Sequence, residues 1–331
     1  MKLRRRTLLE LVAAAAAAAV SLSPRLAQAQ TFPTRPITIV VPFPAGGPTD
    51  TLGRVLADRM RNALGQSVII ENLTGAAGTI GSTHVARSLP DGYTLILGHW
   101  QTHVVNGATY SLQVDVVNDF EPISLIADCP MWLVGKLALP AKDMPELIAW
   151  LKDNPGKATV GIGGAGGGAD VVGTYFQKNT GTRFQFVPYR GAAPIMQDLL
   201  AGHIDMTFTQ VASALPQFRA GQVKAYAVMA KSRWAAVPDT PTSDESGVPG
   251  LYASFWHGLW APKGTPKNIV ARLDAAVVET LADPTVRQRF IELGQEPWPR
   301  DKQNPEALAA QQKVEIQKWW PIIKAAGIRA E

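Results

Sequence analysis

The chain of 331 residues lacks several features that would point to particular functions. Its one cysteine, Cys129, permits no intramolecular disulfide, and we expect a small buried apolar residue there rather than a nucleophile. It contains no G-x-S-x-G, no H-E-x-x-H and no cysteine–histidine pair with supporting spacing. Its scattered acidic residues are those expected of helix caps and solvated faces. We therefore expect no catalytic residues and no enzymatic activity.

Long apolar runs are also missing after residue 30, since crossing a bilayer takes about 20 apolar residues. We expect a protein that does not span a membrane. The first 29 residues combine a basic start, an alanine-rich stretch and the small-residue motif Ala27-Gln28-Ala29, a pattern typical of a secretory signal peptide cleaved after Ala29. The apolar core, Leu11–Leu22, is too short for the alternative of an uncleaved anchor. Arg5 and Arg6 leave twin-arginine export open beside the general route.

Little net charge remains once residues 1–29 are set aside. The whole chain carries +5 with histidine neutral. Residues 1–29 hold five basic residues and one acidic residue, a net +4, so by subtraction the remainder carries +1. No basic surface remains that would suit nucleic acid, and we expect no nucleic-acid partner.

Apolar strand-like runs alternate with helical patterns along the remaining part. Strands are expected at 35–43, 67–72 and 93–98, with a helix between the first two that Thr49 or Asp50 caps and Gly65 ends. The alternation restarts over residues 132–230 and predicts parallel sheets with right-handed crossovers. We predict an α/β fold of two lobes, each a mainly parallel sheet flanked by helices, with a cleft between them. Lobe 1 is residues 30–131 and 254–331, with the helical tail packed back on it, and lobe 2 is residues 132–253.

Glycine-rich loops follow three of the expected strands, at 41–50, 72–81 and 161–170. The spacing Gly161-x-Gly163-x-x-Gly166 fits a dinucleotide fingerprint, but "TGTRFQFVPYR" supplies no acidic residue for the ribose, about 20 positions on. We expect no nucleotide and no other cofactor. A strand–glycine loop–helix unit exposes backbone amides that suit a phosphate or a carboxylate. The alternative for each glycine is a tight turn or close packing.

Nearly all of the chain after residue 30 resembles the tripartite tricarboxylate transporter substrate-binding receptors, the Bug family. The resemblance rests on long motifs, among them "RPITIVVPFPAGGPTDTLGRVLA", "SVIIENLTGAAGTIGSTHVARSLPDGYTLILG" and "VPYRGAAPIMQDLLAGHIDMTF". It implies a periplasmic-binding-protein (Venus flytrap) fold that closes on a small organic anion, a di- or tricarboxylate or an aromatic acid. The membrane subunits of the transporter are the implied partner of this periplasmic, monomeric receptor. A sensor for a two-component system, with the same fold and ligand class, is the alternative.

The resemblance also implies the residues that bind the ligand. One carboxylate would be held by the loop matching 43–49, and a second group by loops matching 161–170 and 188–192. The ligand-binding residues implied in this way are Phe43, Ala45, Gly46, Gly47, Thr49, Thr79, His99, Trp100, Thr102, Gly164, Ala165, Gly166, Asp170, Tyr189, Gly191, Ala192, Thr209, Gln210 and Trp256.

Two departures from the family pattern bear on specificity. Asp170 replaces the histidine common at the end of its loop. It either faces the ligand, favouring an amine, ring N–H or hydroxyl, or caps the following helix. Trp100, with Phe43 and Trp256, forms either flat walls for an aromatic acid or ordinary packing.

Two histidines have a spacing that can hold a metal ion on a helix. His99 and His103 have i, i+4 spacing, but we expect a loop there, and no glutamate follows His99, so no metal site is expected.

Overall fold

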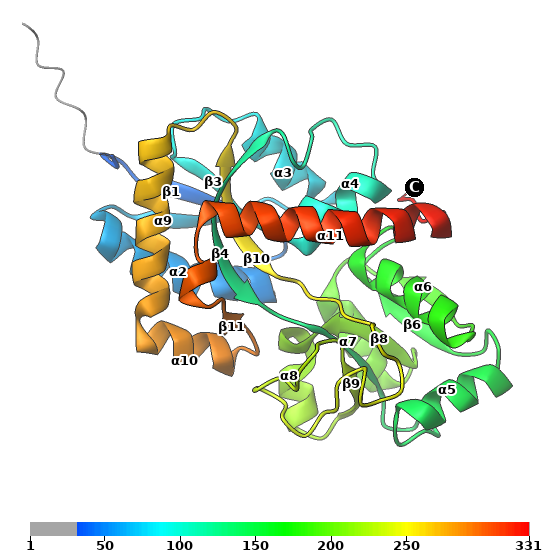
Figure 1. Cartoon of the computed structure of the whole chain (residues 1–331). Coiled ribbons are helices and arrows are strands. Elements are labelled where there is room, and N and C mark those ends of the chain that lie inside the picture. The colour runs from blue at the N-terminus through cyan, green and yellow to red at the C-terminus, as the bar shows by residue number, and fades with distance from the viewer. Residues whose placement is uncertain (1–31, 331) are drawn as a thin grey trace, which may run out of the picture. The chain divides into compact units, whose positions relative to one another are not determined.

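The structure, a computed structural model, describes residues 32–330, and the chain from Arg35 onward forms one compact unit (Figure 1). The predicted signal peptide lies outside the described residues. Within them, no helix is both long enough and apolar enough to cross a membrane. Two β-sheets flanked by helices make up the unit, as expected for the predicted α/β fold.

The first sheet has six strands in the order β11-β4-β10-β3-β1-β2. Its strands are β1 (Ile37–Val41), β2 (Val68–Asn72), β3 (Thr94–His99), β4 (Phe120–Asp128), β10 (His257–Pro262) and β11 (Glu296–Pro297). The near-continuous apolar run of β1 is almost entirely buried because helices cover both faces of this sheet.

The second sheet has five strands in the order β7-β6-β8-β5-β9. Its strands are β5 (Met131–Lys136), β6 (Thr159–Ile162), β7 (Gln185–Pro188), β8 (Met206–Gln210) and β9 (Val223–Val228).

Both sheets are mixed, but most strands of each run in one direction, as predicted: β1, β2, β3 and β4 in the first sheet, and β6, β7, β8 and β9 in the second. Strands β1, β2 and β3 are parallel, as are β6, β7 and β8. Strand β10 runs antiparallel to β3 and β4, and β5 runs antiparallel to β8 and β9. The strands that run against the others are β10 and β11 in the first sheet and β5 in the second. Strands β4 and β5 were not predicted from the sequence.

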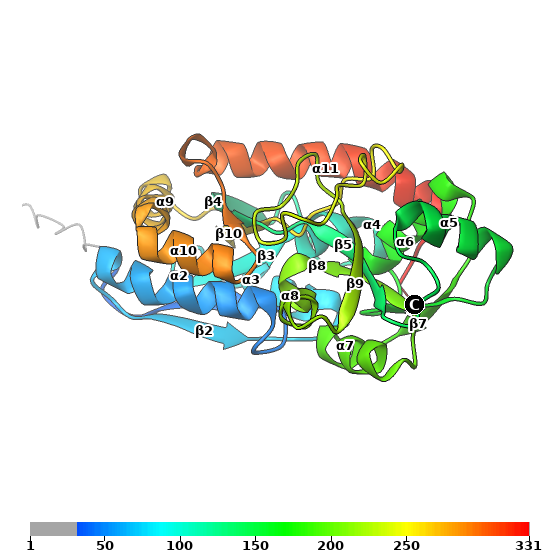
Figure 2. The ribbon, with the colours of Figure 1, turned by 90° about the horizontal axis from the view of Figure 1, so that it is seen from below.

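The first sheet is flanked by helices from both ends of the chain. These helices are α2 (Pro48–Leu64), α3 (Thr79–Ala86), α4 (Asn106–Thr109), α9 (Lys267–Ala282), α10 (Pro284–Glu292) and α11 (Pro305–Ala326). The tail packs back on the first lobe as predicted, because α9 and α11 both contact β4 and α9 also contacts α2. Figure 2 shows α11 and α2 on opposite faces of this sheet.

Four helices belong to the second sheet, namely α5 (Met144–Asp153), α6 (Gly168–Thr180), α7 (Ala192–Ala201) and α8 (Val211–Arg219). Helix α11 also contacts α6, so this long helix touches both lobes (Figure 1).

The chain passes from one sheet to the other between β4 and β5 and returns between β9 and β10. These two passages lie antiparallel to each other. The Met131 amide donates to the Ala253 carbonyl, and the Phe255 amide to the Cys129 carbonyl, both at 2.9 Å. Such a paired crossing suits a hinge, although the exact lobe boundaries given above stay a prediction.

Candidate functional site

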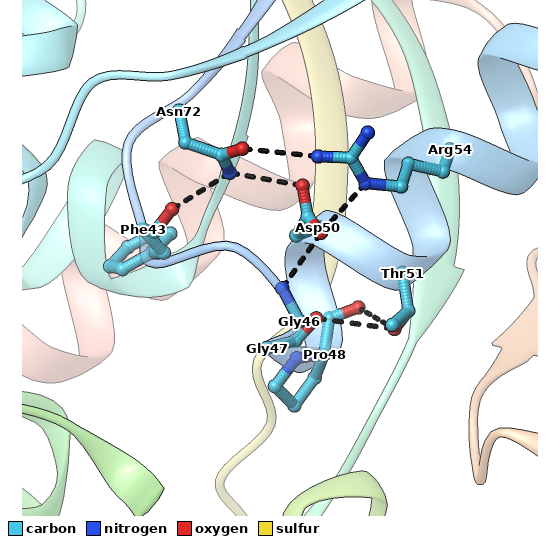
Figure 3. A network of polar contacts seen from close by, with 8 residues as sticks. All are labelled: Phe43, Gly46, Gly47, Pro48, Asp50, Thr51, Arg54 and Asn72. Atoms are coloured by element: carbon cyan, nitrogen blue, oxygen red, sulfur yellow. Dashed lines mark hydrogen bonds and ion pairs between the residues drawn. The ribbon is translucent and has the colours of Figure 1, made fainter.

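The loop after β1 is held by the side chain of Asp50, in the first turn of α2 (Figure 3). Its Oδ2 atom accepts hydrogen bonds from the Gly46 amide at 2.8 Å and from Arg54 Nε at 2.9 Å. Its Oδ1 atom accepts one from Asn72 Nδ2 at 3.0 Å, and the same nitrogen donates to the Phe43 carbonyl at 3.0 Å. One buried carboxylate therefore joins the glycine loop, the start of α2 and the end of β2.

The surroundings of Asp50 favour its ionised form. Burial raises the pKa of a carboxyl group, but the hydrogen bonds from Arg54, Gly46 and Asn72 outweigh it and lower the pKa of Asp50. Arg54 also matches its charge in an ion pair. The start of α2 therefore carries no unpaired negative charge from this residue.

Helix α2 begins earlier than expected, so the predicted cap at Thr49 or Asp50 is wrong. Gly47 is the N-cap, in an extended conformation, and Pro48 is the first helical residue, where its fixed φ is favourable. Asp50 lies inside the first turn and accepts from the Gly46 amide, one residue before the N-cap, whereas the acidic residue of a capping box bonds to the N-cap amide itself. The predicted end at Gly65 is confirmed, since Gly65 is the left-handed C-cap.

The loop between β6 and α6 repeats the first loop in the other lobe. Both contain Ala-Gly-Gly-x-x-Asp, at 45–50 and 165–170. Asp170 Oδ2 accepts from the Gly166 amide at 2.8 Å, the distance found in the first loop. The φ angle is 70° at Gly166 and 78° at Gly46, a left-handed conformation that favours glycine. Each lobe therefore presents a helix N-terminus of the same local form.

Asp170 is not the N-cap of its helix, which is Gly167, but lies in the first turn and binds the loop before it. Besides the bond from Gly166, it accepts one from Thr174 Oγ1 at 3.4 Å. Burial raises the pKa of Asp170, and these two hydrogen bonds only partly offset that effect. Within residues 32–330 it forms no ion pair, in contrast to Asp50. The two helix starts thus share geometry but differ in charge.

Each helix start offers backbone amides to a ligand. The first amides of a helix have no intrahelical acceptor and carry partial positive charge. Among the residues that the structure describes, none accepts a hydrogen bond from the amides of Thr49 and Asp50 in α2 or of Ala169 and Asp170 in α6. These four amides can bind oxygen atoms of an anion.

The segment after β3 lies between the two loops. The His99 ring stacks on Phe43, with 4.3 Å between ring centroids and 10° between planes. The next two residues reach the other loop. A Cβ atom added to Gly168 would lie 2.7 Å from Trp100 Cζ3, and Gln101 Oε1 accepts from the Gly168 amide at 2.6 Å. Three consecutive residues therefore link the loops of both lobes.

Three buried histidines lie in or beside this segment. His257 Nε2 is 3.1 Å from Thr49 Oγ1, and His99 meets His257 edge to face at 5.4 Å. Burial lowers the pKa of both His103 and His257 to about 3. Burial, and then its two histidine neighbours, lowers the pKa of His99 well below its usual value. The Gln101 amide donates to His99 Nδ1 at 3.1 Å, so that atom carries no proton. At neutral pH the cluster supplies hydrogen bonds and not charge.

The tryptophans expected at the site lie in the hydrophobic core. Trp100 is 0% exposed and Trp256 is 1% exposed. Trp100 packs edge to face on Phe255 at 5.5 Å and on Trp319 at 5.1 Å. Of the three aromatic residues proposed as walls, only Phe43 is partly exposed. These contacts favour the packing alternative over an aromatic slot.

The remaining first-lobe residues adjoin the same segment. Thr102 Oγ1 accepts from the His99 amide at 3.0 Å. A Cβ atom on Gly78 would lie 2.8 Å from Thr102 Cγ2 and 3.3 Å from Phe43 Cζ, and Thr79 follows directly as the first residue of α3. The residues expected in lobe 1 are thus brought together around His99.

The remaining second-lobe residues lie on three strand ends. The Tyr189 hydroxyl donates to Asp198 at 2.6 Å, so it is already engaged within the lobe. Gly191 precedes α7 with φ of 118°, and Ala192 begins that helix. Thr209 and Gln210 end β8, where Gln210 Oε1 is buried without a hydrogen-bond partner. In the same loop as Gly166, Gly164 is half-buried and Ala165 is exposed.

Within residues 32–330, no group of three or more histidine, cysteine, aspartate or glutamate side chains is placed to hold a metal ion. The loop expected after β3 is instead a short π-helix, Gln101–Val105, because Thr102 turns the chain by bonding to the His99 backbone. The His103 ring stacks on Trp260 at 3.7 Å.

Two surface hollows, of about 470 and 310 Å³, border Trp320. Neither is lined by a residue expected to bind the ligand. The two glycine loops instead pack against residues 99–101, so the lobes are in contact at the site.

The fold and the site define a class of protein, an α/β binding protein of two lobes in which each lobe contributes a glycine loop and a helix N-terminus. The chain belongs to the tripartite tricarboxylate transporter receptor family, since the model for "Tripartite tricarboxylate transporter family receptor" matches residues 52–328. This family consists of solute-binding receptors and includes the Bug proteins.

Solved structures agree with this assignment. The chain is similar to the periplasmic binding protein BugD, with 40% identity, a TM-score of 0.83, and coverage of 91% of this chain and 100% of that one. It is similar to MatC from Rhodopseudomonas palustris with bound malate, with 37% identity, a TM-score of 0.83, and coverage of 88% and 100%. It is also similar to Rpa4515 of R. palustris with adipate, with 33% identity, a TM-score of 0.84, and coverage of 90% and 99%.

Three polar residues of the site were not among those expected from the sequence. Asn72 bonds to Asp50 and to the Phe43 carbonyl, and Asn106 bonds to the side chain of Gln101. The repeat of Ala-Gly-Gly-x-x-Asp was visible in the sequence and would have singled out Asp50 as the partner of Asp170. No local pattern marks Asn72, Gln101 or Asn106, because their partners lie on other elements.

Proposed function

We propose that this chain is a periplasmic receptor that captures a small organic carboxylate and presents it to the membrane subunits of a tripartite tricarboxylate-type transporter. The observation that carries the proposal is the duplicated loop, which gives each lobe a helix start with two free amides. Malate in MatC and adipate in Rpa4515 are dicarboxylates bound by similar proteins.

The two helix starts bind different chemical groups of the ligand. The α2 start suits a carboxylate, because Arg54 pairs with Asp50 and leaves the helix amides as the dominant local charge. The α6 start bears the unpaired carboxyl of Asp170, which repels a second carboxylate and favours a hydroxyl or N–H group. The ligand enters an open cleft, and closure of the lobes removes water from both ends. Of the nineteen residues implied by the resemblance, Trp100 and Trp256 pack in the core, and the others stay the proposed contact set.

The rest of the proposal follows from this role. The receptor is exported with its signal peptide removed after Ala29, works as a monomer in the periplasm, and performs no chemistry on its ligand. Lobe 1 comprises residues 30–131 and 254–331, and lobe 2 comprises residues 132–253. The backbone amides hold the ligand without a cofactor or a metal.

A thermal-shift screen of residues 30–331 tests the ligand class. Malate, adipate, citrate and benzoate are each paired with the corresponding amide. A ligand that binds only the folded state stabilises it by about 2.7 kcal/mol at a hundredfold excess over its dissociation constant. We expect at least one acid to raise the melting temperature while its amide does not. Amides that shift the transition as much as their acids would contradict carboxylate recognition.

A further inference from the structure

One buried side chain joins the two lobes. Gln101 follows β3 of the first sheet and is 5% exposed. Its Oε1 atom accepts a hydrogen bond of 2.6 Å from the amide of Gly168, the first residue of α6 in the second lobe. Its Nε2 atom donates at 2.8 Å to Asn106 Oδ1 in its own lobe. Both ends of the carboxamide are therefore used, one on each side of the lobe contact.

The orientation of this carboxamide is fixed by its partners. The Gly168 amide can only donate, so it requires the oxygen of Gln101, and the nitrogen must then face Asn106. Asn106 is oriented in turn because its Nδ2 atom donates to the Ala77 carbonyl at 3.0 Å. Donors and acceptors match along the whole series from Ala77 to Gly168. The series arranges Gln101 for the α6 amide before any contact between lobes is made.

The far end of this series is a strained loop of lobe 1. Ala76 and Ala77 have φ of 44° and 52°, left-handed values that residues with a Cβ atom rarely adopt. Such conformations persist only where surrounding contacts hold them, and the Asn106 bond to Ala77 is one of those contacts.

The Gly168 amide at the start of α6 has no counterpart at the start of α2. The equivalent first position of α2 is Pro48, which has no N–H group. Gly168 leaves an amide at this position, and it is buried, since a Cβ there would lie 2.7 Å from Trp100 Cζ3 and 2.9 Å from Phe255 Cζ. A buried amide without an acceptor is costly. Gln101 supplies the acceptor, and with it both helices are left with the same two free amides.

The contact between the Gln101 side chain and the Gly168 amide joins two protein groups. Further contacts continue along the same boundary, where Tyr175 of α6 meets Trp319 of α11 edge to face at 5.7 Å. A Cβ atom on Gly166 would lie 2.9 Å from the Ala330 amide nitrogen. The closed arrangement is thus made by protein groups alone.

We propose that Gln101 is a positioning residue that clasps the α6 helix start to lobe 1 and maintains a closed population of the receptor without ligand. The clasp acts on the lobe equilibrium and does not touch the ligand. It is independent of which ligand the receptor captures.

The test is the distance between spin labels on the two lobes of the ligand-free protein. Lys178→Cys on α6 and Lys313→Cys on α11 place labels on exposed positions, and Cys129 is buried and stays unlabelled. We expect a closed population in the parent. In Gln101→Leu, which keeps the volume but removes both hydrogen bonds, the ratio of open to closed molecules should rise roughly fivefold or more, the effect of one buried hydrogen bond.

Two further variants make the result specific. Gln101→Glu keeps an acceptor for the Gly168 amide and should retain more of the closed population than Gln101→Leu. Gln312→Leu is the matched control, because Gln312 is also buried but bonds to the His103 and Val116 carbonyls within lobe 1. It should leave the distance distribution unchanged.

The proposal is overturned if the ligand-free parent shows no closed population, or if Gln101→Leu has the distribution of the parent. An effect of equal size in Gln312→Leu would also overturn it, by showing a general loss of rigidity. Since no ligand is added, these outcomes are separate from the success or failure of carboxylate binding.

Discussion

Asp50 and Asp170 occupy the same position in two loops of the same form. Each lies in the first turn of a helix, and each accepts a hydrogen bond of 2.8 Å from the amide of the glycine four residues before it. Asp50 is paired with Arg54, and Asp170 has no basic partner within residues 32–330. The shared geometry explains how the lobes present similar helix starts, and the difference in ion pairing is the basis of the proposal that each start accepts a different ligand group.

Removal of the two first-turn carboxylates should destabilise the fold unequally. Asp170→Ala leaves the Gly166 amide without its acceptor and should lower the free energy of unfolding by about 1 kcal/mol, the usual effect of losing one hydrogen bond. Asp50→Ala also releases Arg54 and Asn72 and should cost roughly 2–3 kcal/mol. Urea titration measures both. Asp58→Ala, which loses only an exposed pair with Arg61, is the control and should stay within about 0.5 kcal/mol of the parent. Equal losses at Asp50 and Asp58 would contradict the assigned role.

Asp170→Asn should change the choice of ligand. The asparagine keeps an oxygen for the Gly166 amide but removes the charge. We expect affinity for dianionic acids to rise roughly threefold to tenfold, since a like charge nearby is removed, with little change for monoanionic acids. Calorimetry with a diacid and its monoamide measures the difference. An equal change for both ligands would show that Asp170 does not face the ligand.

The buried histidines should make the fold sensitive to acid. The pKa of His103 and of His257 falls from 6.5 to about 3 on folding, and that of His99 falls as well. Their contribution to stability is therefore present above pH 6.5 and is lost as the pH falls toward 3. Each such group contributes a slope of about 1.4 kcal/mol per pH unit.

Several carboxyl groups act in the opposite sense, since burial raises the pKa of Asp128, Asp170, Asp274, Glu296 and Glu315. The largest of these shifts brings the pKa of Asp128 to about 6, partly offset by hydrogen bonds from Ser254 and the Cys129 amide. The contribution of Asp128 is lost as the pH rises from about 4 to 6. The three histidines take up protons in the unfolded chain below about pH 6.5 and together outweigh Asp128, so urea midpoints should fall between pH 7 and pH 5. An unchanged midpoint would show that the histidines are not buried as described.

Gln101→Leu should weaken the binding of every acid by the same factor. Ligand enters the open form, but the final complex is closed and contains the clasp. Loss of the clasp therefore lowers the stability of every closed complex alike and leaves the contacts with the ligand unchanged. Calorimetry with two or more acids found in the screen measures the factor for each. A loss confined to one acid would instead place Gln101 against the ligand.

Local sequence signals predicted those parts of the fold that depend on neighbouring residues. The apolar run of β1, the glycine end of α2 and the loops at 41–50 and 161–170 are all visible within short windows. Strand β4 contains Pro122, which interrupts its pattern, and Pro130 separates it from β5 by a short break; both strands were missed. Their pairing with β10 and β8 depends on residues far along the chain.

In the candidate site, too, some features follow from neighbouring residues and others depend on residues far along the chain. The glycine loops could be located from sequence, because their conformation requires glycine. The burial of Trp100 depends on Trp319, and the role of Gln101 depends on Gly168, so neither follows from a local window. Long-range packing decides which polar groups stay free for a ligand.

The most direct test of the account is calorimetry of residues 30–331 with one acid and its amides. For the diacid that raises the melting temperature most, the diacid, its monoamide and its diamide are titrated in turn. We expect the diacid and the monoamide to bind with one site per chain, because the α2 start requires one carboxylate, and the diamide to show no binding. A diamide that binds as tightly as the diacid would contradict the claim that helix amides hold an anion.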